Sequence, residues 1–168
     1  MKLHTLLALV VFPFSAAQAA ESITIDGVHN CCKSCENGIK KAVESVRGAK
    51  LASSTKTSAT VEVKSKSDTK KVLEALMDGG YYGTVGSEAS SAPASASAAP
   101  KVATATVSGV HLCCGKCATA AKEAVESVAG VKEHTVVSKA KTFDVKGDFA
   151  VADLVAALNK AGFHGKVK

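Results

Sequence analysis

All six cysteines of this 168-residue chain lie in two short strings that share one pattern. The pattern is H-x-C-C-x-x-C, and it occupies residues 29–35 and again residues 111–117. Thiolates are soft ligands, and two cysteines three residues apart can face one point. The strings therefore predict sites for a soft metal ion, and their duplication makes a coincidence improbable.

The candidate metal ligands are the cysteines and histidines of both strings. They are His29, Cys31, Cys32, Cys35, His111, Cys113, Cys114 and Cys117. The C-x-x-C pairs are the primary candidates, and the residues leave open whether the extra cysteine and the histidine of each string also bind. Three sulfurs and one nitrogen would suit tetrahedral Zn(II) as well as Cu(I). The sequence also leaves open whether the two sites share one ion.

The strings belong to a longer internal repeat. Residues 21–86 align with residues 103–168 without a gap, and 23 of the 66 positions are identical. Two domains of equal length are expected, at residues 20–87 and 101–168, joined by a Ser/Ala/Pro linker at residues 88–100. Domains of this size can build one small core, so a large buried substrate pocket is not expected.

Hydrophobic periodicity predicts the elements that position the cysteines. Residues 22–28 alternate apolar and polar side chains, as in a half-buried strand that ends where the first string begins. Apolar residues then recur at helical spacing up to Gly48 in one repeat and Gly130 in the other. These residues are Ile39, Ala42, Val43 and Val46, and Ala121, Ala124, Val125 and Val128. The thiols would then lie at a helix N-terminus, whose dipole favours thiolate.

The rest of each repeat predicts two strands, a second helix and a final short strand. The strands fall near residues 50–57 and 60–64, or 131–138 and 142–146, with Val61, Val63, Phe143 and Val145 inward. The second helical stripe is 72–76 or 154–158, and the last strands reach Val85 and Val167. The order βαββαβ predicts an α+β fold of two ferredoxin-like sandwiches in tandem.

The first 19 residues predict an export signal. Lys2 precedes a mostly apolar run that Pro13 interrupts, and residues 17–19, Ala-Gln-Ala, suit cleavage. The processed chain would be periplasmic or secreted and not embedded in a membrane. An oxidising compartment favours disulfides, but each domain has three cysteines within five residues, which is a poor disulfide framework.

Other classes of function find less support. Without Lys2, 20 Lys and Arg stand against 15 Asp and Glu, and Trp is absent, so a nucleic acid partner is not expected. The chain shows no hydrolase or nucleotide-binding motif and is predicted not to be an enzyme. Two alternatives stay open. One is a thiol-disulfide oxidoreductase, although Pro13, Pro93 and Pro100 are poorly placed for the cis-proline of such enzymes; the other is a metal-independent docking module.

Both repeats resemble the heavy-metal-associated domain family of copper chaperones, metal-ATPase modules and the periplasmic mercury-binding protein. The resemblance rests on C-x-x-C after the first strand, on Ile39 or Ala121 four residues beyond it, and on late Gly-aromatic pairs at residues 80–81 and 162–163. It implies that the thiolates bind Cu(I) foremost, or Hg(II), Zn(II) or Cd(II), in an exposed site of low coordination number. It also implies transfer by ligand exchange with a metal-transporting membrane protein or another metal-binding domain.

The chain departs from the family motif at its methionine, which is replaced by Asn30 and by Leu112. Leu112 can fill the core in its place, whereas Asn30 must find hydrogen-bond partners or face solvent. The family fold places Tyr81 and Phe163 beneath the metal loop, with His164 as a secondary ligand candidate. The sequence thus predicts an exported soft-metal-binding protein that captures, buffers or transfers its ion.

Overall fold

The computed structural model describes residues 21–86 and 100–168. The predicted signal peptide and residues 88–99 of the predicted linker lie outside the described residues, so the domain boundaries stay predictions. Among the described helices, none combines the length and the apolar character needed to cross a bilayer.

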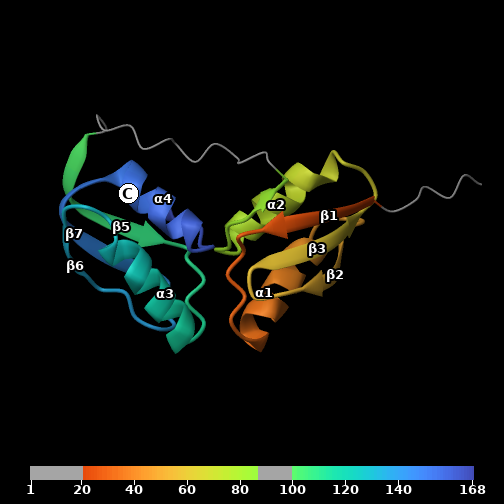
Figure 1. Ribbon diagram of the computed structural model, residues 1–168, viewed down its shortest axis with the longest axis horizontal. Coiled ribbons are helices and arrows are strands. Elements are labelled where there is room, and N and C mark those ends of the chain that lie inside the picture. Colours follow the sequence, from red (N-terminus) through yellow and green to blue (C-terminus); the bar gives the residue numbers. More distant parts are fainter. Residues whose placement is uncertain (1–20, 87–99) are drawn as a thin grey trace, which may run out of the picture.

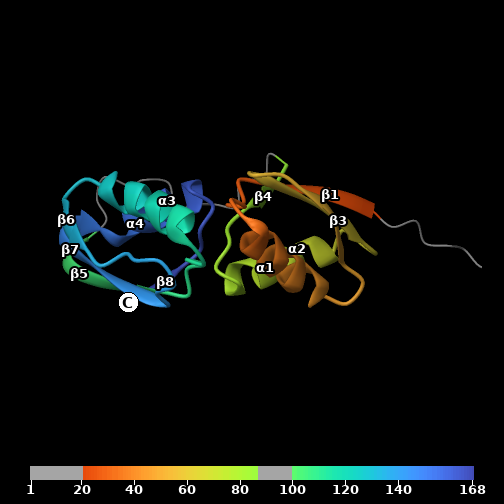
Figure 2. The ribbon, with the colours of Figure 1, turned by 90° about the horizontal axis from the view of Figure 1, so that it is seen from below.

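The first domain contains six elements. They are β1 (Glu21–Asp26), α1 (Lys33–Glu44), β2 (Lys50–Ser54), β3 (Ser58–Val63), α2 (Asp68–Asp78) and β4 (Thr84–Val85). The strands pair in the order β2-β3-β1-β4, and every pairing is antiparallel. Both helices lie on one face of the sheet (Figures 1 and 2).

The second domain repeats this arrangement. Its elements are β5 (Lys101–Ser108), α3 (Gly115–Glu126), β6 (Val131–His134), β7 (Thr142–Ala150), α4 (Val151–Lys160) and β8 (Lys166–Val167). Its strands pair antiparallel in the order β6-β7-β5-β8. The predicted α+β fold of two ferredoxin-like sandwiches is confirmed. In Figure 2 the helices lie below the sheet in the first domain and above it in the second.

The core forms where each sheet meets its helices, as the periodicity predicts. In β1, Ile23 and Ile25 are buried while the alternate residues are exposed. The helical stripe supplies the opposite side of the core, with Ile39 and Val43 fully buried in the first domain. This one-sided burial is the reason that a period of two marks the strands and a period of 3.6 marks the helices.

Both cysteine-bearing helices end earlier than predicted. They end at Glu44 and Glu126, four residues before Gly48 and Gly130. Each glycine instead has a positive φ, of 88° and 91°, in the turn that leads into the next strand. The glycines therefore mark the reversal of the chain and not the last helical residue.

The two repeats also differ in strand register. Ile25 pairs with Ala59 in the first domain, whereas its counterpart Val107 pairs with Phe143. The ungapped alignment equates Ala59 with Lys141, so β7 is displaced by two residues relative to β3. Since a shift of two keeps every side chain on its face, the predicted inward residues are nevertheless buried.

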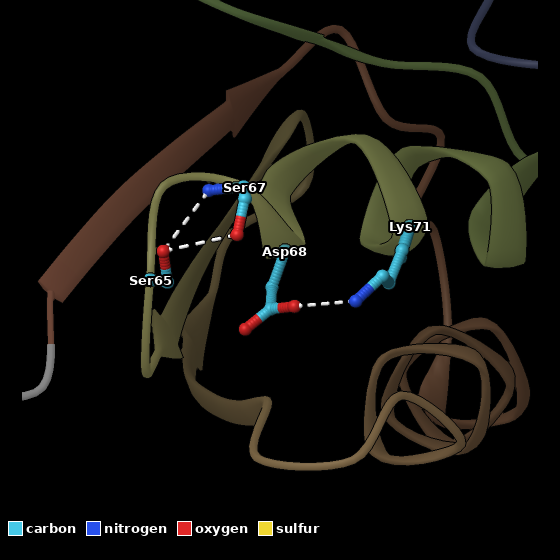
Figure 3. A network of polar contacts seen from close by, with 4 residues as sticks. All are labelled: Ser65, Ser67, Asp68 and Lys71. Atoms are coloured by element: carbon cyan, nitrogen blue, oxygen red, sulfur yellow. Dashed lines mark hydrogen bonds and ion pairs between the residues drawn. The ribbon is translucent and has the colours of Figure 1, made fainter.

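A small polar network surrounds the start of α2 in the first domain (Figure 3). The backbone N–H and the hydroxyl of Ser67 both donate to Oγ of Ser65, and Lys71 pairs with Asp68 at 2.9 Å. Asp68 lies in the first turn, where the helix dipole favours a negative charge. The network therefore lies where the turn after β3 leads into α2.

Candidate metal centre

The C-x-x-C pairs lie at the N-termini of α1 and α3. Cys32 and Cys114 are the N-cap residues, with extended backbones, and Cys35 and Cys117 lie buried in the first helical turns. An extended N-cap followed by helix turns both side chains of a pair to the same side. Their sulfurs are 3.6 Å apart in α1 and 3.7 Å apart in α3.

The extra cysteine of each string faces the same point as the pair. Sγ of Cys31 lies 3.8 Å from Sγ of Cys35, and Sγ of Cys113 lies 3.5 Å from Sγ of Cys117. An alternating strand end could have turned these side chains away, but here the backbone bends between strand and helix. Each domain therefore presents three thiols together.

The two sets of three thiols meet across the domain boundary. Sγ of Cys31 lies 3.5 Å from Sγ of Cys117, and Sγ of Cys35 lies 3.5 Å from the sulfurs of Cys113 and Cys117. Cys31 also approaches Cys114 at 3.8 Å, and Cys32 approaches Cys113 at 3.7 Å. All six are free thiols. We call this set of six the thiol cluster.

A direct junction between the domains holds the thiol cluster together. The N–H of Tyr82 donates to the carbonyl of Gly162 at 3.0 Å, and the N–H of His164 donates to that of Gly80 at 3.1 Å. Tyr81 and Phe163 form an antiparallel bridge between these bonds. This junction was not predicted from the sequence, although the duplicated Gly-aromatic pairs were its signal.

Glycine is required at the junction because the backbones approach closely. Gly80 has φ +82°, and a Cβ there would lie 2.6 Å from the backbone nitrogen of His111. Gly162 has φ +83°, and a Cβ there would lie 2.9 Å from Cβ of His29. Each glycine thus packs on the loop that leads into the cysteines of the other domain.

The string histidines pack against the aromatic residues of the opposite domain, His111 stacked on Tyr81 and His29 tilted against Phe163. The rings of His29 and Phe163 are 4.5 Å apart between centroids, as are those of Tyr81 and His111. The Nε2 atoms of His29 and His111 are buried without a hydrogen-bond partner. Burial lowers the pKa of both rings, and at His111 the repulsion that a protonated His29 would exert lowers the pKa further. Both are therefore neutral imidazoles near neutral pH.

Of the predicted histidine ligands, only some lie close enough to the sulfurs to share a metal ion with them. A ring nitrogen of His29 lies within 4.8 Å of the sulfurs of Cys31 and Cys117. In the described part of the chain, His111 and His164 belong to none of the three-ligand groups found. Burial lowers the pKa of His164, whose Nδ1 is also buried without a partner.

The helix N-termini lower the pKa of the thiols, whereas burial raises it. The backbone N–H of Cys117 is the main cause that lowers the pKa of Cys114 to about 6. At Cys35, burial opposes ionisation, but hydrogen bonds, first from the backbone of Cys31, outweigh it and lower the pKa. Burial raises the pKa of Cys31 and Cys113 to about 12. Part of the cluster is thus ready to bind as thiolate, and the rest must exchange protons for a cation.

The residues that replace the motif methionine lie as their chemistry predicts. Leu112 is buried in the core of the second domain. Asn30 finds a partner, because its Nδ2 donates to the carbonyl of Thr55 at 2.8 Å. Beneath the loop, Tyr81 and Phe163 are buried as expected, and the hydroxyl of Tyr81 donates to the carbonyl of Cys35 at 3.2 Å.

Fold and site together define a class of protein in which two ferredoxin-like domains close on a single cluster of thiols. Residues 104–164 match the sequence profile of the heavy-metal-associated domain family, so the second repeat carries a domain of this family. The chain is also similar to the solution structure of the N-terminal soluble domains of Bacillus subtilis CopA. The identity is 20%, over 90% of this chain and 96% of that chain, with a TM-score of 0.34.

Proposed function

We propose that this protein is an exported metal-binding protein that captures, buffers or transfers Cu(I) through the thiolates of its two CCxxC strings. The observation that carries the proposal is the meeting of six free thiols with sulfur separations of 3.5 to 3.8 Å. The match of residues 104–164 to the heavy-metal-associated domain family supports it.

The donor atoms favour a soft ion. Thiolates select Cu(I), Zn(II) and related ions over hard cations such as Mg(II) or Ca(II). The alternatives to copper are therefore Zn(II), Hg(II) and Cd(II), for which a nitrogen of His29 would supply a further ligand.

Partial exposure of the cluster suits transfer. Cys35 and Cys117 are buried, whereas the other four cysteines are half-buried. An incoming thiolate could therefore reach a bound ion at these four residues and displace the ligands one at a time. The expected partners are a metal-transporting membrane protein or another metal-binding domain, and the protein acts by binding and not by catalysis.

The test is an anaerobic titration of the reduced protein with Cu(I), and separately with Zn(II), against a competing chelator, followed by native mass spectrometry. The wild type should retain Cu(I), and replacement of Cys32, Cys35, Cys114 and Cys117 together by serine should abolish retention. A His29→Ala, His111→Ala variant should keep Cu(I). Zn(II) binding that requires the histidines, without Cu(I) binding, would contradict the copper assignment.

Two further measurements test the remaining parts of the proposal. If the chain is exported, intact-mass analysis of protein from the producing cell should show a product that begins at Ala20. If it is a carrier and not a reductase, its rate of disulfide reduction should not exceed that of free dithiothreitol at equal thiol concentration.

A further inference from the structure

The sulfurs of the thiol cluster form several groups of three, and four of these groups together include each sulfur twice. Three of these groups have all ligand atoms within 4.8 Å of one another. They are Cys31, Cys32 and Cys35; Cys32, Cys113 and Cys114; and Cys35, Cys113 and Cys117. The fourth group joins Cys31, Cys114 and Cys117, with separations of 3.8, 3.7 and 3.5 Å.

The four groups share their members in a regular way. Each sulfur belongs to two of the four groups, and it shares a group with four of the other five sulfurs. Cys31, for example, shares a group with every cysteine except Cys113. This is the connectivity of an octahedron whose alternate faces are the four groups.

We propose, on the basis of the proposed copper binding, that the thiol cluster holds one tetranuclear Cu(I) centre in which six bridging thiolates join the two domains. Each Cu(I) would lie at one of the four groups and bind three sulfurs, and each sulfur would bridge two Cu(I) ions. The two domains would thus share all four ions in one centre.

The ligand count matches three-coordinate ions. Four such ions need twelve metal–sulfur bonds, which six bridging thiolates supply. Four tetrahedral Zn(II) ions would need a further ligand each, and His29 is the one ring nitrogen of the described residues that falls in a three-ligand group. Cu(I) is stable with three thiolates, so the cluster fits it without other donors.

The sulfur separations fit the same geometry. With a metal–sulfur bond of about 2.3 Å, a planar three-coordinate ion holds its sulfurs about 4.0 Å apart. Of the twelve sulfur pairs that share a group, nine are 3.5 to 3.8 Å apart and the other three lie within 4.8 Å, so the separations need to change by only a few tenths of an ångström to about 0.8 Å. Loading would therefore need only small displacements of the sulfurs.

The surroundings balance the charge of such a centre. Binding four Cu(I) ions releases the remaining thiol protons and leaves two net negative charges on the centre. The N-termini of α1 and α3 both adjoin it, since Cys32 and Cys114 are their N-cap residues. Helix N-termini stabilise anions through their free N–H groups and dipoles.

The experiment is a Cu(I) titration of the reduced full chain, read by native mass spectrometry and by the orange luminescence of polynuclear Cu(I) thiolates shielded from water. We expect a four-copper species to dominate before saturation, with few intermediates, and luminescence to rise with it. A short copper–copper shell in X-ray absorption should accompany it.

The key variant is Cys31→Ser, Cys113→Ser, which keeps both C-x-x-C pairs and therefore the means to bind copper. It should bind at most two Cu(I) ions per chain, without luminescence, and circular dichroism should show an unchanged fold. A variant that still forms the luminescent four-copper species would overturn the proposal.

The titration of the wild type distinguishes a failure of this proposal from a failure of the proposed copper binding on which it rests. Saturation at one or two Cu(I) ions without luminescence would overturn the tetranuclear centre and leave copper binding in place. No retention of Cu(I) against the chelator would overturn both.

Discussion

Replacement of Gly80 by alanine should separate the two domains without unfolding either. Gly80 has φ +82°, and its added Cβ would lie 2.6 Å from the nitrogen of His111 and 3.0 Å from the carbonyl carbon of Val110. Both atoms belong to the backbone of the other domain. They can move away only if the junction opens, so the substitution acts on docking and not only on local conformation.

The expected effect of Gly80→Ala combines two free-energy terms, the backbone strain within its own domain and the loss of docking between the domains. A non-glycine residue in the left-handed region costs roughly 1–2 kcal/mol in the stability of its own domain. Three hydrogen bonds join the domains at Gly80 and Gly162, with lengths of 3.0, 3.1 and 3.4 Å. At about 0.5–1.5 kcal/mol each, they contribute only a few kcal/mol to docking. The steric overlap of the added Cβ with the backbone of the other domain costs about as much free energy as these hydrogen bonds supply. The arrangement with the domains undocked should therefore become the dominant one.

Gly27 offers a matched control. Its φ is +83°, and an added Cβ would meet nothing within 4 Å. Gly27→Ala should therefore lower the free energy of unfolding in urea by roughly 1–2 kcal/mol through backbone strain, and Gly80→Ala should lower it by the same strain plus the docking energy that is lost. Only Gly80→Ala should also increase the radius of gyration in small-angle X-ray scattering and abolish the four-copper species.

Two results would refute this reasoning. An unchanged radius of gyration in Gly80→Ala would mean that the junction is not what holds the domains together. An increase of equal size in Gly27→Ala would mean that backbone strain, and not overlap with the other domain, controls docking.

Three further substitutions test the described contacts by urea unfolding. Leu112→Ala should cost about 2–5 kcal/mol, because it removes a buried side chain and leaves a cavity; a loss under 1 kcal/mol would contradict its role in the core. Tyr81→Phe should cost about 1 kcal/mol through loss of the bond to the Cys35 carbonyl, and it converts the residue to the type found at the same place in the second domain. Lys71→Met should change stability by less than about 1 kcal/mol, because its pair with Asp68 is largely exposed on the lysine side; a larger loss would show that the pair matters beyond the surface.

The parts of the fold that bury one face were predictable from the sequence. Alternation at Ile23 and Ile25 marked β1, and the stripe at Ile39 and Val43 marked α1, since each pattern records which side meets the core. The displaced register of β7 was not predictable in this way. A displacement of two residues preserves the pattern, so Phe143 reads as inward in either register.

The candidate site was predictable residue by residue but not as an assembly. The cysteine spacing indicated the ligands of each repeat, because three residues at a helix start converge locally. The docking of the repeats depends on backbone contacts of Gly80 and Gly162, which carry no hydrophobic periodicity. The flanking Tyr81 and Phe163 are buried, as core residues beneath the metal loop would also be, so their apolar character did not distinguish a core position from a junction.

The equivalence of the two halves of the junction has a consequence for assembly. Tyr82 donates to Gly162 as His164 donates to Gly80, and the ring of His29 packs against Phe163 as the ring of His111 packs against Tyr81. Such reciprocal contacts are the isologous interface of a symmetric dimer, here formed within one polypeptide. The covalent connection makes their association unimolecular, so each half meets the other at a fixed effective concentration. Copper loading of the centre should thus not depend on the protein concentration. In a dimer of separate chains, by contrast, dilution would separate the two halves of the centre.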